Sequence, residues 1–548
     1  MADIVLINPQ FRPSYWGLNY AMPFFGRIKT LLPVINLPLL AALTPFQHTV
    51  AVIDENVEEI DFDRCSRADI VGLTGMNVQR QRMHEILAEL KRRNIFTVVG
   101  GPLVTVDPDD FAEETDVIFL GEAEETWPRF LQDWSCGEHQ RRYEQAEKTD
   151  MATLPPPRLD LLRMDKYLYG AVQLSRGCPF TCEFCDIIVV FGRRPRIKSA
   201  AQVIAEIEAV ALAGRRDIFM VDDNLIGNKK AIKELLREIV AWQRAHRYPV
   251  TFLTEASIDL AEDEELMQLM VEANIDTVFV GIESPDEEAL RETKKIQNLA
   301  DRRGTLLEKV HRIQAAGMQV TCGMIVGFDA DDETVFERQR QFIHKARIPS
   351  AMINLLVAIP KTPLFARLAK EGRLDMSGMM ANRGYLAEAR FGTNVIPLRM
   401  SRQVLWEGHL RLLRELYTAD AFFSRLDGLY LDRKWLPAAG RTRYLLSHDR
   451  PRWLRVRLRA LGEGLYLYRR LMRFITDPEL RRQYRQHVWR AFLRRPNPRV
   501  LRDYCFFAVM HFHHHSLVRQ LIADTAALGS EGEAEMPRAL PAPVAAAE

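Results

Sequence analysis

The sequence predicts an α/β protein with two successive parallel-sheet domains and a mostly helical C-terminal region. Short apolar, β-rich runs alternate with helix-like segments over residues 1–135 and again over 167–370, and after about residue 371 these runs cease. Continuous apolar strands separated by helices indicate parallel sheets covered on both faces. A chain of 548 residues is also too long for one core, which favours two or three domains.

Residues 1–135 predict a doubly wound, Rossmann-like domain. Its apolar runs are DIVLIN, VAVIDEN, DIVGLTGMN, FTVVGGP and VIFLGEAEE, and residues 79–93 predict an amphipathic helix. Ligands of such sheets lie outside the carboxyl ends of the strands. Because no GxGxxG follows the first run, a dinucleotide is not expected. We expect another cofactor at the residues that end the runs, although glycines there also permit tight turns: Asn56, Thr74, Gly75, Gly100, Gly101, Gly121 and Glu122.

Residues 136–166 are polar and then proline-rich, which predicts a linker. The second series, residues 167–370, contains AVQLSR, DIFMVDDN, VTFLTEAS, TVFVGIES, QVTCGMIVGF and AMINLLVAI. Six strand–helix units in a row predict a partial (β/α)6 barrel with its chemistry at the carboxyl-terminal mouth.

The C-terminal region, residues 371–526, is predicted to be helical and basic. Residues 431–520 hold 21 Lys and Arg against 6 Asp and Glu, while the whole chain carries a net charge of only +1. Such helices could contact an anionic membrane surface or nucleic acid, or could simply be solvated. No nucleic-acid-binding motif is present, so no nucleic acid is expected. The run His511–His515 predicts part of a basic amphipathic helix, and residues 527–548 predict a disordered tail.

The location of the protein is predicted from its apolar segments and cysteines. The N-terminus lacks the pattern of a signal peptide, and Pro33 and Pro38 interrupt the longest apolar stretch. Of seven cysteines, three lie within eight positions, which favours metal binding in a reducing compartment over disulfides. We therefore expect a cytoplasmic protein, with membrane association through the basic helices as the open alternative.

The three crowded cysteines form the strongest motif. In SRGCPFTCEFCD, Cys178, Cys182 and Cys185 directly follow the first predicted barrel strand. Each thiolate can bind one iron of a four-iron cluster, which leaves the fourth iron open for a substrate or cofactor. The alternative is a closed zinc site completed by a distant fourth ligand.

With Phe184 before its last cysteine, this motif resembles the signature of the radical S-adenosylmethionine (radical SAM) superfamily. The resemblance implies a 4Fe-4S cluster that binds S-adenosylmethionine at the open iron and cleaves it to a 5′-deoxyadenosyl radical. It also implies an electron donor such as flavodoxin or ferredoxin. The residues implied to contact S-adenosylmethionine end successive barrel strands: Asp222, Asp223, Asn224, Glu255, Glu283, Gly323 and Gly327.

An α/β domain before the barrel resembles the cobalamin-binding branch of this superfamily. The matching strings include VIDENVE, GLTGMNVQRQRM, VVGGP, LGEAEETWP, VDDNLIGNKK, VGIESPDE and GFDADD, and the resemblance extends into a C-terminal domain of unknown function. The DxHxxG string that supplies an axial histidine elsewhere is absent, because Glu55 and Asn56 follow Asp54. The resemblance implies cobalamin bound without a protein histidine; the alternative is a vestigial domain.

Members of this branch methylate unactivated carbons, including those of hopanoid lipids and bacteriochlorophyll precursors. The resemblance therefore implies methylation of a hydrophobic small molecule or lipid, with one S-adenosylmethionine forming the radical and another methylating cobalamin. Radical cyclisation or carbon–carbon bond formation without methyl transfer is the alternative reaction. A cobalamin or iron–sulfur sensor is the alternative without catalysis.

Overall fold

The computed structural model describes residues 1–301, 303–375, 392–437 and 440–531, and its N-terminal part is a parallel six-stranded sheet. The strands are β1 (Asp3–Asn8), β2 (Thr49–Asp54), β3 (Ile70–Thr74), β4 (Thr97–Gly100), β5 (Val117–Leu120) and β6 (Arg142–Glu144), in the order β2-β1-β3-β4-β5-β6. The accompanying helices are α1 (Asn36–Leu43), α2 (Phe62–Cys65), α3 (Arg80–Arg92), α4 (Pro102–Val106) and α5 (Thr126–Cys136).

Alternate residues of these strands enter two separate cores, as the doubly wound prediction requires. Ile4 and Leu6 of β1 face one core, whereas Val5 and Ile7 face the other, which α3 covers. The expected boundary at residue 135 is too early, because β6 pairs with β5 inside the predicted linker. The strand order reverses between β1 and β3. In sheets of this kind, ligands bind outside the carboxyl ends of the strands near such a reversal.

The second part is the predicted open barrel, a parallel sheet whose strands follow in chain order. It contains β7 (Gly170–Val172), β10 (Asp217–Met220), β11 (Thr251–Glu255), β12 (Ile275–Glu283), β13 (Gln319–Val326) and β14 (Ala351–Leu355), with β7 and β14 at its edges. A short antiparallel pair, β8 (Ser175–Arg176) and β9 (Arg196–Ile197), lies beside it. Its helices are α6 (Ile187–Val190), α7 (Ala200–Leu212), α8 (Lys229–Ala245), α9 (Glu264–Glu272), α10 (Glu287–Glu292), α11 (Leu306–Ala316), α12 (Val335–Lys345) and α13 (Pro363–Lys370).

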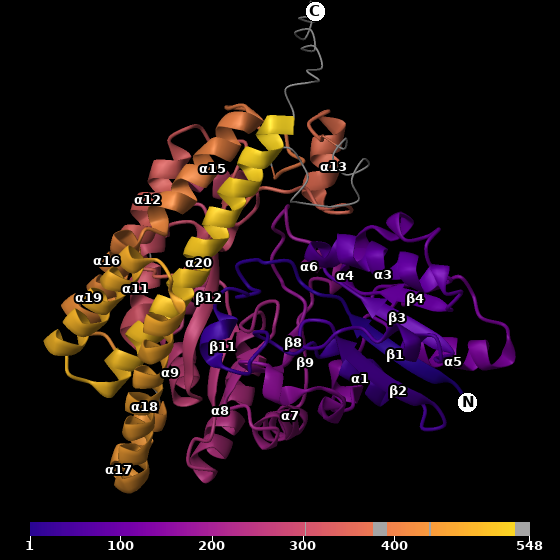
Figure 1. Ribbon diagram of the computed structural model, residues 1–548, viewed down its shortest axis with the longest axis horizontal. Coiled ribbons are helices and arrows are strands. Elements are labelled where there is room, and N and C mark those ends of the chain that lie inside the picture. Colours follow the sequence, from indigo (N-terminus) through magenta and orange to yellow (C-terminus); the bar gives the residue numbers. More distant parts are fainter. Residues whose placement is uncertain (302, 376–391, 438–439, 532–548) are drawn as a thin grey trace, which may run out of the picture.

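The C-terminal helices cover the side of the barrel that lies away from the N-terminal sheet (Figure 1). They are α15 (Arg402–Leu416), α16 (Ala419–Asp427), α17 (Gly440–His448), α18 (Arg450–Phe474), α19 (Pro478–Arg494) and α20 (Pro498–Glu531). Their apolar side chains form one continuous core with the barrel. Helix α20 extends into the start of the predicted tail, and residues 532–548 of that tail lie outside the described residues.

The expected basic character of the histidine run is wrong. His511, His513 and His514 are buried, and burial lowers the pKa of His511 to about 3 and that of His513 to about 4. His511 bonds to the carbonyl of Tyr417 at 3.0 Å, and His513 bonds to the carbonyl of Ser14 at 2.9 Å. These histidines are therefore neutral core residues.

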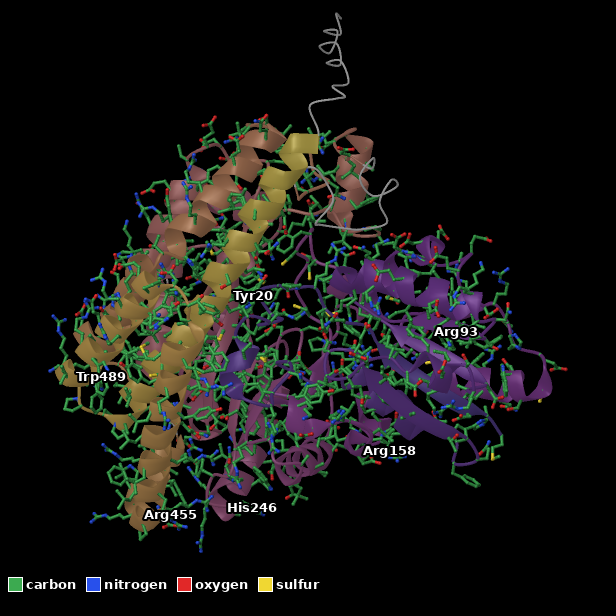
Figure 2. All side chains as sticks on the ribbon, viewed as in Figure 1. Tyr20, Arg93, Arg158, His246, Arg455 and Trp489 are labelled. Atoms are coloured by element: carbon green, nitrogen blue, oxygen red, sulfur yellow. The ribbon has the colours of Figure 1, made fainter. Side chains whose placement is uncertain are left out.

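Arginines supply the basic surface instead, most densely on α18. This helix holds eight arginines and one glutamate, and exposes Leu454 and Leu458 on its surface. Arg455 lies near the outer end of the helix (Figure 2). Among the described residues no helix is both long and apolar enough to pass through a membrane. Contact of α18 with a membrane surface stays a prediction.

The segment between β1 and α1, residues 9–35, leaves the N-terminal sheet and packs on the barrel. The ring of Trp16 lies 5.0 Å from that of Phe279 on β12 and 6.2 Å from that of Phe219 on β10. Nearby, the amide of Tyr20, labelled in Figure 2, donates to Nδ1 of His513 on α20 at 3.3 Å. This segment thus joins the barrel interior to the C-terminal helices.

Candidate active site between two cofactor-binding domains

Cys178, Cys182 and Cys185 lie on the loop between β8 and α6, at the carboxyl-terminal mouth of the barrel, and all three are free. Gly177 begins this loop with φ +94°, and a Cβ there would lie 2.9 Å from the carbonyl oxygen of Arg194. Only glycine fits such a close approach in a left-handed conformation. The local sequence therefore fixes where the loop leaves the strand.

The residues around the cysteines fit a four-iron cluster. The side-chain amide of Asn224 lies 3.8 Å from Cys178 Sγ, and that of Gln297 lies 3.7 Å from Cys182 Sγ, so both can donate to cluster sulfurs. Among the described residues, no three His, Cys, Asp or Glu side chains converge on one metal ion. A four-iron cluster needs no such convergence, because each thiolate binds a different iron.

The acidic residues that end β10 hold the cysteine loop in place. Asp222 Oδ1 accepts the amides of Leu174, at 3.0 Å, and of Ser175. Asp223 Oδ2 accepts the amide of Gly177 at 2.7 Å. Burial raises the pKa of Asp222 to about 7 and that of Asp223 to about 6. Both residues thus position the loop, and which of them also meets S-adenosylmethionine stays a prediction.

Glu255, at the end of β11, is the acid most available to a ligand. No described residue forms a hydrogen bond or ion pair with its carboxylate, and its side chain is only partly buried. Burial, together with the charges of Asp223 and Asp222, raises its pKa to about 8. A group of acids in this position favours a cation, and the amine and sulfonium of S-adenosylmethionine are cationic. The residues therefore fit this cofactor.

Glu283, at the end of β12, pairs with a lysine that the sequence analysis missed. Its carboxylate lies 2.8 Å from Lys295 Nζ, and Lys295 also lies 6.0 Å from the ring of Phe184, inside the cysteine motif. The φ of Glu283 is +63°, a conformation that costs of order 1–3 kcal/mol and is concentrated at functional sites. Lys295 follows α10 rather than a strand, so the strand-end pattern could not identify it.

The two glycines implied to contact S-adenosylmethionine have different surroundings. A Cβ at Gly323 would lie 3.1 Å from the ring of Phe279, which points into the barrel. A Cβ at Gly327 would lie 2.9 Å from Leu405 of α15, and Gly327 has φ +106°. Gly327 thus permits close packing of α15, which is a structural reason for glycine that the prediction did not include.

A cavity of about 180 Å³ lies at the carboxyl edge of the N-terminal sheet and is bounded by both domains. Its lining includes the predicted residues Thr74, Gly100, Gly101, Gly121 and Glu122, together with Trp127 and, from the barrel side, Arg176, Val190 and Phe191. At this size, below the range of about 300–1,000 Å³ for whole-ligand pockets, it would hold part of a larger cofactor. The mainly apolar lining fits part of a cobalamin bound between the domains.

The glycines of this edge are required by close approaches. Gly101 has φ +100°, and a Cβ there would lie 2.4 Å from Thr74 Oγ1. Gly75 does not line the cavity; a Cβ there would lie 2.4 Å from Met83 Sδ of α3, so this glycine serves helix packing. Close packing of α3 therefore explains Gly75, whereas the left-handed turn at Gly101 also shapes the cavity.

Two of the predicted cofactor residues are already bonded within the protein. Asn56 lies outside the cavity, where its Oδ1 accepts the amide of Phe11 at 2.9 Å. The Glu122 carboxylate is 2.8 Å from Arg196 and 3.1 Å from Arg176, and it also accepts the amide of Thr149. Glu122 therefore joins the two domains, a role that its place at a strand end did not reveal.

Comparison with known sequences agrees with this arrangement. Residues 24–131 match the B12 binding domain, residues 172–339 match the radical SAM superfamily, and residues 362–527 match a domain of unknown function, DUF4070. An uncharacterized methyltransferase of Synechocystis is 41% identical over 77% of this chain and 77% of its own length. The hopanoid C-2 methylase of Rhodopseudomonas palustris is 35% identical over 68% of this chain and 71% of its own length.

Solved structures share the fold. The cobalamin-dependent radical enzyme OxsB, with aqua-cobalamin and S-adenosylmethionine bound, matches with a TM-score of 0.60 at 15% identity, over 97% of this chain and 81% of its own. The radical methyltransferase TsrM of Kitasatospora setae, with tryptophan and an S-adenosylmethionine analogue bound, matches with a TM-score of 0.55 at 18% identity, over 68% of this chain and 76% of its own. The 4Fe-4S cluster, S-adenosylmethionine and cobalamin are thus the implied cofactors. The chain belongs to the family of cobalamin-dependent radical SAM methyltransferases.

Proposed function

We propose that this protein transfers a methyl group to an unactivated carbon of a hydrophobic small molecule or lipid. One observation carries the proposal: the cobalamin-side cavity and the cysteine loop share a wall. Arg176 immediately precedes the loop, Val190 and Phe191 follow it within α6 and its C-cap, and all three line the cavity. When bound, the cofactors would supply a hydrogen-abstracting radical and a transferable methyl group, and these three residues connect the loop and the cavity that would hold them.

The chain's own residues would bring these two functions together. Asp222 and Asp223 hold the cysteine loop, Glu255 offers an unpaired carboxylate to a cation, and Glu122 keeps the domains in register. Holding reacting groups at a fixed separation is itself a large part of catalysis. The hydrophobic substrate class is supported by the 35% identical relative, which is a hopanoid C-2 methylase.

The test uses lipids from a strain that lacks the gene. Oxygen-free, reconstituted protein with a reductant, cobalamin, S-adenosylmethionine and this lipid extract should form a product heavier by one methyl group. It should also release 5′-deoxyadenosine and S-adenosylhomocysteine in equal amounts, because radical formation and cobalamin methylation each use one S-adenosylmethionine. Product analysis by mass spectrometry reads out all three. A substrate-dependent product without S-adenosylhomocysteine would contradict methyl transfer and indicate cyclisation or bond formation.

A further inference from the structure

A large cavity lies at the amino-terminal end of the barrel, opposite the mouth that carries the cysteine loop. Its volume is about 900 Å³, near the top of the range of about 300–1,000 Å³ for small-molecule sites. The barrel contributes residues that begin its strands, such as Asp217 of β10, Thr251 of β11 and Gln319 of β13. The remaining walls come from α18, α20 and the segment of residues 15–31. Three separate parts of the chain thus line this cavity.

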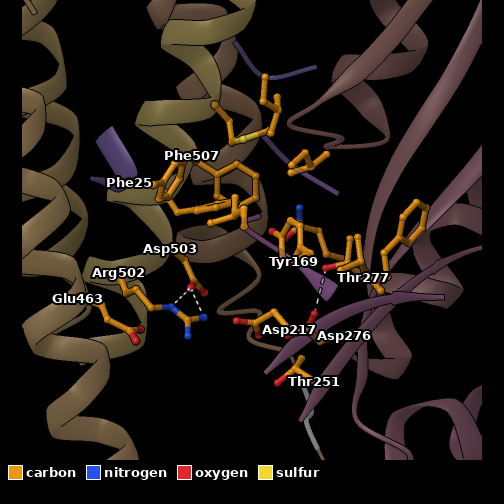
Figure 3. A pocket seen from close by; sticks show the side chains of 18 of the residues that line it. Phe25, Tyr169, Asp217, Thr251, Asp276, Thr277, Glu463, Arg502, Asp503 and Phe507 are labelled. Atoms are coloured by element: carbon orange, nitrogen blue, oxygen red, sulfur yellow. Dashed lines mark hydrogen bonds and ion pairs between the residues drawn. The ribbon is translucent and has the colours of Figure 1, made fainter. Parts of the chain in front are cut away.

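The end of this cavity nearest the active site is aromatic and apolar. Trp16, Phe219, Leu253 and Phe279 line it, and Phe25 and Phe507 continue the apolar wall on the helical side (Figure 3). Leu253 lies two residues before Glu255 on β11, a rise of about 7 Å along the strand. One end of an apolar ligand in the cavity would therefore lie close to Glu255 at the carboxyl-terminal mouth of the barrel.

The other end of the cavity is lined by charged side chains, most of which form ion pairs with one another. Arg502 bonds to Asp503 at 2.7 Å, and Arg499 bonds to Asp276 at 3.0 Å. Asp217 differs, because no described residue forms a hydrogen bond or ion pair with it and its side chain stays exposed to the cavity. Figure 3 shows it between Arg502 and Asp276.

Two features select the kind of group that Asp217 would bind. Desolvation by the protein around the cavity raises the pKa of Asp217; the charges of Arg441 and Arg502 oppose that rise, whereas those of Asp276 and Glu463 add to it, so its carboxylate already has charges of both signs nearby. A neutral hydroxyl therefore suits it better than another cation. The hydroxyl of Tyr169, also in the lining and without a hydrogen bond to a described residue, can donate to the same group.

We infer that this cavity binds the substrate as an elongated apolar body that carries a hydroxyl group, with the apolar end against Trp16, Phe219 and Phe279 and the hydroxyl at Asp217 and Tyr169. The inference rests on the proposed function, since it places the hydrophobic substrate of that reaction. It assigns the C-terminal helices a role in holding the substrate, because α18 and α20 line the cavity.

Binding is tested with a matched pair of probes, a pentacyclic triterpene alcohol and the hydrocarbon of the same skeleton, each delivered from cyclodextrin to the full-length protein. Wild type should bind the alcohol about 10-fold or more tightly than the hydrocarbon, as expected for a hydrogen bond to a charged group. Asp217→Leu should remove this preference and leave the hydrocarbon's Kd unchanged. Tyr169→Phe, which removes only a hydroxyl, should weaken the alcohol about 3-fold and provides the test if Asp217→Leu fails to fold.

The control is Asp420→Leu, which removes an acid on α16 whose side chain is 86% exposed and which does not line the cavity. It should bind both probes like wild type. Equal Kd values for alcohol and hydrocarbon in wild type, or an unchanged preference in both Asp217→Leu and Tyr169→Phe, would overturn the inference. Release of 5′-deoxyadenosine is measured in parallel. If wild type releases 5′-deoxyadenosine but binds neither probe, the cavity is not the substrate site, although the proposed function stands. If wild type binds the alcohol but releases no 5′-deoxyadenosine, the proposed function is refuted, although the cavity binds such a ligand.

Discussion

Cys182→Ser should abolish the reaction. Cys182 is 7% exposed and lies in the loop that would bind the cluster, so serine keeps the packing but removes one of three iron ligands. After anaerobic reconstitution we expect loss of cluster iron and visible absorption, and 5′-deoxyadenosine at the level found without enzyme. Iron analysis and chromatography of the nucleoside products measure both effects.

Cys136→Ser is the matched control for this substitution. Cys136 is an exposed free cysteine at the end of α5, far along the chain from the motif. This variant should keep the iron content and product formation of wild type. Wild-type levels of 5′-deoxyadenosine from Cys182→Ser would show that the loop does not carry the reactive cluster.

Glu122→Gln should destabilise the contact between the two cofactor domains by about 3–5 kcal/mol, the usual effect of breaking a buried ion pair. The Glu122 side chain is 1% exposed, and the side chains of its partners Arg176 and Arg196 are 7% and 14% exposed. Neutralising the carboxylate removes the acidic partner of Arg196, whereas Arg176 keeps its ion pair with Glu124 at 2.6 Å. The free energy of unfolding from denaturant titration measures the change.

The pH dependence of this contact follows from the same residue. Burial raises the pKa of Glu122, but hydrogen bonds from Arg196 and the charge of Arg176 outweigh it, so the net pKa is lowered. The stabilisation is therefore present above the ordinary glutamate pKa of about 4.3 and is lost as the pH falls through the lower folded value.

Glu144→Gln is the control for Glu122→Gln. Glu144 lies on β6 with a 60% exposed side chain paired to Arg142, and such surface pairs contribute about 0–1 kcal/mol. A Glu122→Gln effect no larger than that of Glu144→Gln would contradict the proposed link between the domains.

The sequence predicted those elements whose signal is local. The strands of both sheets appear as apolar runs because parallel strands are buried on both faces. The cysteine motif needs only spacing, so Cys178, Cys182 and Cys185 could be placed on one loop. Strand β6 was missed because only Tyr143 of its three residues points inward, and a short polar edge strand resembles a linker.

The remaining differences depend on contacts between distant residues. Glu122 follows a strand like a ligand residue, but Arg176 and Arg196 engage it from the other domain. Gly327 meets Leu405, and the histidines of α20 meet the N-terminal segment and Tyr417. A single sequence shows none of these pairings, because each joins residues far apart in the chain.

The central claim is that three cysteines bind a cluster whose fourth iron is open to S-adenosylmethionine. Electron paramagnetic resonance of the reduced, reconstituted protein, recorded before and after adding S-adenosylmethionine, tests it most directly. The account predicts a 4Fe-4S signal that changes when the cofactor is added. Zinc in place of iron, or a cluster signal that the cofactor leaves unchanged, would contradict it.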